Sequence, residues 1–193
     1  NFGILMIQGL VNSFGSAVMA AFAVAVKIDT IAYMPVQDFG NAFSVFTAQN
    51  FGAGKHDRIK SGIKQSLISV VLFCFAVSTA VFFLSEPLMS LFCSDSETVA
   101  IGVQYLRTEG LCYIGIGILF MLYGYYRAVN KPLMSVILTI LSLGTRVLLA
   151  YILSPVSTFG VMGIWVSIPI GWFLADTAGI GYYILRERRQ YQK

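Results

Sequence analysis

The sequence is poor in charge: of its 193 residues only 11% are Asp, Glu, Lys or Arg, whereas 57% are hydrophobic. A soluble domain carries about 25% charged residues, so there is too little polar surface here to enclose a water-soluble core of this size. The shortage of charge, together with a mean hydropathy of +0.77, predicts an integral membrane protein. In such a protein the net charge of +4 indicates basic cytoplasmic loops and not a nucleic-acid partner.

Cysteine and histidine are scarce as well. The three cysteines, Cys74, Cys93 and Cys112, stand far apart, and His56 is the single histidine. These spacings match neither a Cys/His zinc motif nor a disulfide framework, and the thiols are expected to pack as small apolar groups. Because a nucleophile–base pair and a metal cluster are also not visible, the sequence predicts neither an enzyme nor a cofactor.

One glycine-rich stretch, FTAQNFGAGKHDRIK at 46–60, invites comparison with a phosphate-binding loop. A Walker A motif needs a glycine five residues before its Gly-Lys pair and a Ser or Thr after it. Here Gln49 and His56 occupy those positions, so the comparison fails. The stretch instead predicts a helix that ends at its glycines and is followed by cations at the membrane surface.

Six apolar stretches are long enough to cross a bilayer, which takes about 20 residues of helix. Turn-forming residues separate them; Lys27–Thr30 is expected to divide the first two, with Asp29 or Thr30 as an N-cap. The predicted fold is therefore all-α, an integral membrane bundle with six helices at residues 2–26, 31–51, 65–85, 99–126, 133–153 and 159–185.

The basic residues predict the orientation of this bundle. They occupy alternate loops, at 55–64, at Arg127 and Lys131, and at 186–193, whereas the opposite loops are mainly acidic. Cytoplasmic loops carry an excess of Lys and Arg, so both chain ends are expected in the cytoplasm and the protein in the plasma (inner) membrane. The chain opens inside an apolar segment without a methionine, which favours one lobe of a longer carrier whose N-terminal lobe is missing.

Several polar residues fall within the second predicted helix. Asp38 lies three residues after Pro35, and Gln37 and Asn41 share nearly the same helical face. An acid inside a membrane helix is costly unless it faces a cavity or a partner, which makes Asp38 a candidate for the substrate or cation pathway. Alternatively, Asp38 lies close to the outer headgroups, and both interpretations stay open.

Two other helices carry polar stripes. Gln8 and Asn12, one turn apart in the first helix, either join helices by hydrogen bonds or line a cavity. In the fourth helix Glu109 and Tyr113 stack at a spacing of four residues. Glu109 is either a proton carrier or the partner of an arginine, Arg107 or Arg146, in a structural ion pair.

Arg146 and Asp176 are the charges deepest in the fifth and sixth predicted helices. Their depths from the cytoplasmic side look similar, and pairing is the usual fate of charges within a membrane. The sequence therefore predicts a buried Arg146–Asp176 pair with a mainly structural role, and a role in gating is the alternative.

Two stretches resemble the multidrug and toxic compound extrusion (MATE) transporters. PVQDFGNAFSVFTAQNFGAGKHDRIKSG at 35–62 is similar to the eighth helix of that family and its following Gly-Ala-Gly loop. YRAVNKP at 126–132 is similar to the loop after the tenth helix, with Ala128 and Asn130 in place of glycines. The resemblance implies helices seven to twelve of a transporter whose two six-helix lobes enclose a V-shaped cavity.

Two departures from the family pattern concern the coupling ion. Some members place a cation-linked Glu on helix seven, where Asn12 stands here, and some place an Asp in the middle of helix ten, where 113–120 holds no acid. The resemblance implies exchange of drugs for external H⁺ or Na⁺. The ion would then bind in the missing N-terminal lobe, at Asp38 or at Glu109.

The resulting hypothesis is a secondary active antiporter that exports lipophilic, cationic drugs by alternating access. Its partners would be small lipophilic cations, membrane lipids and its own N-terminal lobe. Aromatic and methionine side chains would bind flat cations by stacking and cation–π contacts, and the candidates are Tyr33, Met34, Phe43, Tyr113, Phe120 and Tyr123.

Two other functional classes remain as alternatives to an antiporter. A flippase for lipid-linked oligosaccharides or polysaccharides, within the same broad superfamily, would need a more basic cavity than Arg107 and Arg146 provide. A six-helix module without a transport role would lack polar stripes that face inward.

Overall fold

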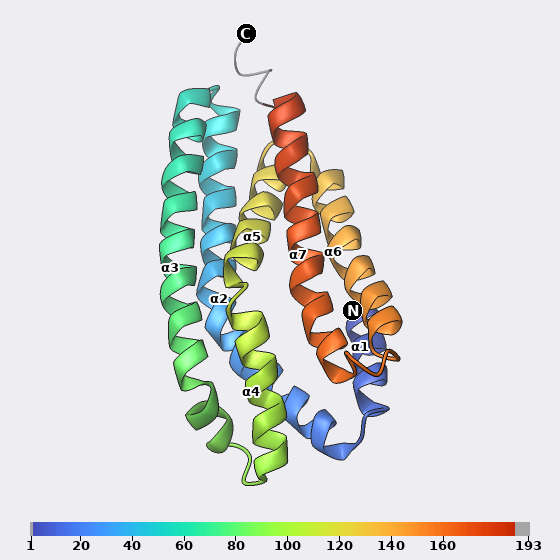
Figure 1. Cartoon of the computed structure of the whole chain (residues 1–193). Coiled ribbons are helices and arrows are strands. Elements are labelled where there is room, and N and C mark those ends of the chain that lie inside the picture. Colours follow the sequence, from blue (N-terminus) through green and yellow to red (C-terminus); the bar gives the residue numbers. More distant parts are fainter. Residues whose placement is uncertain (1, 188–193) are drawn as a thin grey trace.

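The structure is a computed structural model that describes residues 2–187, and within that range it contains helices and no strand. The predicted all-α fold is therefore confirmed (Figure 1). The helices are α1 (Phe2–Asn12), α2 (Ser16–Gly52), α3 (His56–Ser90), α4 (Ser96–Gly110), α5 (Tyr113–Ala128), α6 (Pro132–Leu153) and α7 (Val161–Tyr182), and a π-helical turn, Tyr183–Glu187, continues α7.

The first two helices differ from the prediction. The chain turns at residues 13–15 and not at 27–30, so 2–26 is not one helix. Gly15 has a φ of 104°, a backbone conformation that glycine adopts without strain, and the turn ends α1 after 11 residues. Residues 27–30 contain neither glycine nor proline, and α2 runs through them for 37 residues. The expected N-cap, Asp29, therefore lies inside a helix about 55 Å long.

The fourth predicted helix, 99–126, is broken near its middle. α4 ends at Gly110, α5 begins at Tyr113, and the two helices are bent by 53°. At its other end α4 begins after Asp95, whose carboxylate accepts hydrogen bonds from the N–H and hydroxyl of Thr98 at 2.9 and 2.7 Å. These bonds hold the pKa of Asp95 below its usual value and cap the helix.

The remaining helices follow the prediction more closely. α6 and α7 begin and end within a few residues of their expected limits, and α3 is longer at both ends than the expected 65–85. Within residues 2–187, four helices are long and apolar enough to cross a membrane, and α4 with α5 makes a fifth if the bent pair is one span. The described part of α1 has 11 residues, fewer than the about 20 that a crossing takes.

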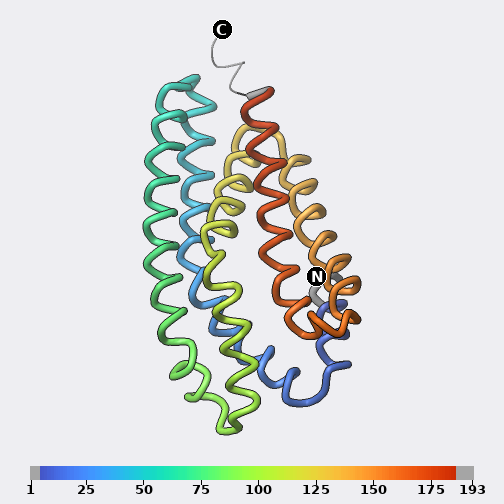
Figure 2. Tube along the Cα trace, viewed as in Figure 1, coloured from blue at the N-terminus to red at the C-terminus, as the bar shows by residue number. Residues whose placement is uncertain are grey.

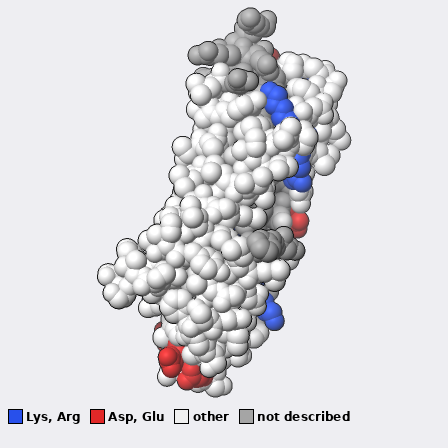
Figure 3. Space-filling view, turned by 90° about the vertical axis from the view of Figure 1, so that its right-hand side faces the viewer, with Lys and Arg blue, Asp and Glu red and all other residues white. Residues whose placement is uncertain are grey.

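The loops alternate between the two ends of the bundle (Figure 1). The loops that follow α2 and α5, with the basic residues of 55–64 and 127–131, lie at the end where α7 finishes. The opposite end holds Glu86, Asp95 and Glu97, and Figure 3 shows acidic side chains gathered there. Lys27 is exposed on α2 and belongs to no loop. The basic residues Arg188, Arg189 and Lys193 lie outside the described residues.

Two close helix contacts depend on small residues. A Cβ on Gly124 of α5 would lie 2.5 Å from the carbonyl oxygen of Gly40 on α2. A Cβ on Gly171 of α7 would lie 2.5 Å from the carbonyl oxygen of Ser142 on α6. Small residues let the backbones of membrane helices approach closely, so these positions fix how α5 packs on α2 and α7 on α6.

The outer surfaces of α3 and α6 are apolar. Leu72, Phe75 and Phe83 on α3 are 65 to 72% exposed, and Leu133 and Ile140 on α6 are similarly exposed. Large exposed apolar surfaces of this kind mark contact with a membrane or a partner. The first turns of α2 run obliquely across the acidic end of the bundle before the helix rises beside α3 (Figure 2).

Candidate functional site

Two carboxyl groups meet inside the bundle. Asp29 on α2 is 3% exposed and Glu109 on α4 is 1% exposed, and their side chains lie within hydrogen-bonding reach of each other. The Tyr113 hydroxyl, on α5, donates to Oδ1 of Asp29 at 2.5 Å, and Tyr105 lies within hydrogen-bonding reach of Glu109. We call these four residues the acid cluster. It joins α2, α4 and α5.

The break between α4 and α5 positions half of this cluster. Glu109 is in the last turn of α4 and Tyr113 is the first residue of α5. Just before the break, a Cβ on Gly110 would come within 3.1 Å of Val81, so Gly110 packs closely against α3. Helices interrupted within a membrane are tolerated where protein buries them, and transporters use such interruptions to bind ions.

Aromatic rings surround the acid cluster. The Trp165 ring on α7 stacks on Phe22 at 5.5 Å between centroids and meets Tyr105 edge-on at 5.0 Å. Arg146 on α6 is close enough for its charge to act on both carboxyl groups, and its guanidinium lies 6.0 Å from the centroid of Trp172. The cluster therefore combines two acids and one neighbouring cation in a largely apolar environment.

This arrangement can bind a proton or a monovalent cation. Two adjacent carboxylates buried among aromatic rings repel each other and lose hydration, so full ionisation of both is costly without a compensating charge. Arg146 supplies part of that charge, and one Glu109 oxygen, Oε1, has no hydrogen-bond partner among the described residues. Within residues 2–187 no group of three or more His, Cys, Asp or Glu side chains lies close enough to hold a metal ion in the usual way.

The sequence-based candidates divide into two groups. Glu109 and Tyr113 lie together in the acid cluster. Asp38 does not join them, because it is nine residues, about 13.5 Å, farther along α2 than Asp29 and its side chain is exposed. Gln8 and Asn12 are exposed on α1. A role for these exposed residues would lie on a surface and not in the cluster.

Sequence reasoning missed Asp29 because it placed that residue in a loop. The available signal was helical spacing: Phe22, Asp29 and Tyr33 recur at intervals of seven and four residues, which puts all three near one helical face. A loop would not be expected to keep that spacing through Lys27. Asp29 could therefore have been recognised as an acid inside a membrane helix, and hence as a functional candidate.

The predicted Arg146–Asp176 ion pair is not present. Arg146 is level with Gly171, because a Cβ on that glycine would come within 3.6 Å of the arginine Cβ. Asp176 lies five residues, about 7.5 Å, farther along α7, and both its carboxylate oxygens lack hydrogen-bond partners among the described residues. The two depths looked similar in the sequence only because the helix ends were uncertain.

The alternative partner for Glu109, Arg107, is occupied elsewhere. The Arg107 Nε donates to the Ser85 hydroxyl at 3.2 Å, and its guanidinium lies 5.2 Å from the centroid of Phe82. Among the described side chains, those of residues 5–185, Lys60 pairs with Asp57 at 3.7 Å and Glu109 forms no ion pair with Arg107 or Arg146. A structural ion pair therefore does not account for Glu109.

A groove of about 430 Å³ lies between α2, α5 and α6. Gln37 and Asn41, both predicted pathway residues, line it together with Phe120 and Tyr123. Arg127 donates from Nη2 to the Asn41 side-chain oxygen at 3.2 Å. Ser135, Val136, Thr139 and Ile140 complete the lining. The groove thus offers aromatic faces, amides and one cation to a ligand.

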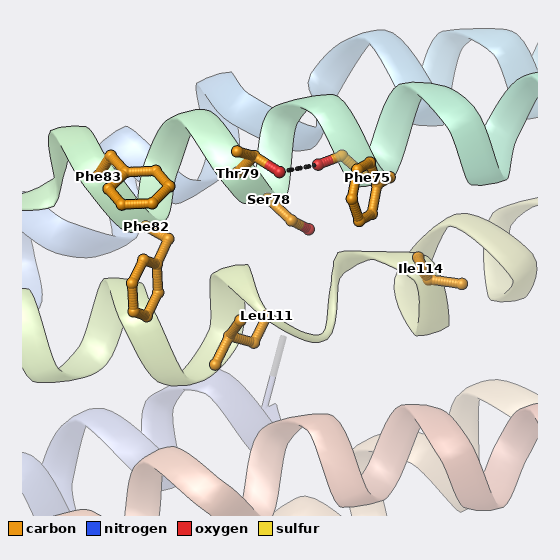
Figure 4. Close-up of a pocket in the computed structure, with 7 residues that line it drawn as sticks. All are labelled: Phe75, Ser78, Thr79, Phe82, Phe83, Leu111 and Ile114. Atoms are coloured by element: carbon orange, nitrogen blue, oxygen red, sulfur yellow. Dashed lines mark hydrogen bonds between the residues drawn. The ribbon is translucent and has the colours of Figure 1, made fainter.

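A second hollow, of about 260 Å³, lies on the other side of the α4–α5 break (Figure 4). Five residues of α3 face Leu111 and Ile114 across it, and three of the five are phenylalanines, Phe75, Phe82 and Phe83. Phe75, Phe83 and Leu111 are largely exposed. This hollow is apolar and opens toward the surroundings of α3, so it suits an acyl chain better than a polar ligand.

The chain is similar in sequence to several known proteins. "Probable multidrug resistance protein YoeA" of Bacillus subtilis is 26% identical over 180 residues, which are 93% of this chain and 39% of that protein. The "FAD transporter" of Shewanella oneidensis is 25% identical over 95% of this chain and 40% of its own length. The chain therefore spans about two fifths of these relatives.

Solved structures show the same fold. The Vibrio cholerae MATE transporter VcmN in its bent form superimposes with a TM-score of 0.86, over 94% of this chain and 41% of that one, at 18% sequence identity. The sequence profile of the MatE family matches residues 1–152. This match covers more than half of the chain, so the chain belongs to the MatE family, the multidrug and toxic compound extrusion transporters.

Proposed function

We propose that the intact transporter containing this chain exports lipophilic organic cations by antiport against H⁺ or Na⁺. The observation that carries the proposal is the acid cluster, in which Asp29 and Glu109 are both almost fully buried and lie within reach of each other. Structural acids inside a membrane are normally paired with a basic group, whereas this pair shares one nearby arginine.

Ion binding would act on the packing of three helices. When a proton or Na⁺ enters the acid cluster, the repulsion between the two carboxylates falls and α2, α4 and α5 can pack more closely around it. When the ion leaves, the charges favour an arrangement that admits water. An ion that binds one arrangement more tightly shifts the equilibrium toward it, and the 53° break between α4 and α5 provides a joint at which that shift can occur.

The substrate would bind in the groove between α2, α5 and α6. Phe120 and Tyr123 offer ring faces to a flat cation, while Gln37 and Asn41 offer adaptable hydrogen bonds. An N-terminal lobe would form the opposite wall, since the relatives are about two and a half times as long as the part matched here. Alternating access would then rock one lobe against the other.

The proposal is tested by transport in liposomes that contain the intact protein. Asp29→Asn and Glu109→Gln should each lower ion-driven export of a fluorescent cation by about 5- to 150-fold, the range that a coupling free energy of 1–3 kcal/mol gives. Asp57→Asn is the matched control, because this acid is fully exposed outside the bundle and its loss should leave transport unchanged. Equal transport by all four proteins would refute coupling at the acid cluster.

A second substrate class is favoured by Arg127, which brings a guanidinium to the groove. A phosphate-bearing aromatic molecule would stack on Phe120 or Tyr123 and pair with that arginine. One relative is named as a transporter of FAD, a molecule of this class. The same liposomes, loaded with flavin nucleotide in place of the cation, separate the two classes: Arg127→Gln should abolish flavin transport and leave cation transport largely intact.

A further inference from the structure

A third buried acid lies apart from the acid cluster. Asp176 on α7 is 4% exposed, and neither carboxylate oxygen has a hydrogen-bond partner among the described residues. Asp29, in contrast, accepts a hydrogen bond from Tyr113. An ionised carboxylate held without a partner in an apolar interior costs several kcal/mol or more. Its environment therefore decides whether it carries a charge.

Among the described side chains, no basic group lies within ion-pairing distance of Asp176. On α5, Tyr123 interacts electrostatically with Asp176. The Tyr126 hydroxyl, also on α5, donates a hydrogen bond to the carbonyl oxygen of Gly179 at 2.6 Å. From α6 the charged group is Arg146, which lies about 7.5 Å away along the axis and acts on Asp29 and Glu109. Of these three groups, Tyr123 is thus the one that interacts with Asp176.

Tyr123 connects Asp176 with the groove. Tyr123 lines the groove between α2, α5 and α6, together with Thr139, which lies within hydrogen-bonding reach of the tyrosine hydroxyl. The groove is open to solvent or ligand, whereas Asp176 is enclosed. The Tyr123 and Thr139 hydroxyls can both donate and accept hydrogen bonds, so they can relay a proton from the groove. The last step to Asp176 then needs a movement of a side chain or a water molecule, because neither Asp176 oxygen has a hydrogen-bond partner among the described residues.

The position along the bundle separates this acid from the acid cluster. Asp176 is six residues, about 9 Å, from the end of α7, on the side that carries the basic loops. The acid cluster lies at the α4–α5 break, reached from a different set of helices. The two sites therefore face different surroundings and can exchange ions independently.

We propose that Asp176 is a second proton-binding site, which exchanges protons through Tyr123 with the groove between α2, α5 and α6. A proton fits better than Na⁺, because a hard metal cation needs several oxygen ligands and both oxygens of Asp176 are unpartnered among residues 2–187. The site does not depend on the proposed antiport, since a proton can bind there whether or not it drives a drug.

Infrared spectroscopy of the intact protein in lipid tests this site directly. The C=O stretching band of protonated carboxyl groups is titrated from about pH 5 to about pH 9. Exposed carboxyl groups lose their proton at the acidic end of this range, whereas buried ones can keep it to higher pH. Asp176→Asn should remove one band that persists toward the alkaline end, while the double variant Asp29→Asn with Glu109→Gln should keep it. A spectrum of Asp176→Asn identical to that of the unchanged protein would overturn the proposal.

The route is tested separately by hydrogen–deuterium exchange of the same band. Tyr123→Phe keeps Asp176 and removes the hydroxyl of the proposed route, so the band should remain but its shift in D₂O should slow about tenfold or more, the effect of about 1.4 kcal/mol on a barrier. Tyr151→Phe, an exposed tyrosine on α6, is the control. Unchanged exchange in Tyr123→Phe would exclude this route. The infrared titration and the exchange measurement do not depend on the transport activity of the acid cluster variants, so failure of the proposed antiport would leave both results valid.

Discussion

The hydrogen bond from Tyr113 to Asp29 links α5 to α2 in the interior. Tyr113→Phe removes the donor and leaves a buried acceptor without it, which costs about 1–3 kcal/mol. We expect a lower free energy of unfolding, measured by thermal or denaturant unfolding in detergent. Tyr151→Phe is the control, because its hydroxyl makes a 3.4 Å hydrogen bond on the surface and its loss should cost less than about 0.5 kcal/mol. Equal losses of unfolding free energy in the two variants would mean that the interior hydrogen bond does not stabilise the protein.

At the same scale, the sequence predicted polar residues better than their partners. Glu109 and Tyr113 share a helical spacing, so their association could be read from one segment. The contact between Glu109 and Asp29 joins residues 80 positions apart, and its prediction required the correct start of α2. The Arg146–Asp176 pairing failed because a shift of five residues in depth, about 7.5 Å, exceeds the reach of an ion pair.

At the scale of helices, the Gly40–Gly124 contact sets the distance between α2 and α5. Gly124→Ala would place a Cβ 2.5 Å from the Gly40 carbonyl oxygen, so the helices must separate at a cost of about 1–3 kcal/mol. Gly144→Ala is the matched control within α6, because a Cβ there has no neighbour within 4 Å. Alanine favours a helix over glycine by up to about 1 kcal/mol, so this control should be neutral or stabilising in the same unfolding measurement.

Helix ends were predictable where turn chemistry is explicit. The 52–55 turn contains glycines and ends α2 as expected, and Pro132 begins α6. Asn130, which replaces a glycine of the family loop, has a φ of 58°, a conformation that asparagine adopts more readily than most residues. The α4–α5 break has no proline, and its glycine, Gly110, is one of many in the chain. Packing against α3 does not distinguish that glycine either, because Gly102 and Gly117 also pack against α3.

For the whole molecule, the distribution of charge predicts the orientation in the membrane. The loops at 52–56 and 128–132 and the end of α7 lie together, and the basic residues of the described chain gather mainly there (Figure 1). The acidic end is formed by the α3–α4 loop (Figure 3). Because Lys and Arg are retained on the cytoplasmic side, we expect the basic end, and with it the groove entrance beside Arg127, to face the cytoplasm.

This orientation is tested by labelling single cysteines with a membrane-impermeant maleimide. The two positions are Lys60→Cys at the basic end and Glu97→Cys at the acidic end, in a background where Cys74, Cys93 and Cys112 are replaced by alanine. In intact cells Glu97→Cys should react and Lys60→Cys should not, because the bilayer blocks the reagent from the cytoplasmic face; after permeabilisation both should react. The cysteine-free background, which must still unfold cooperatively, controls for nonspecific labelling. Labelling of Lys60→Cys in intact cells would reverse the orientation and place the Tyr123 route to Asp176 on the outer side.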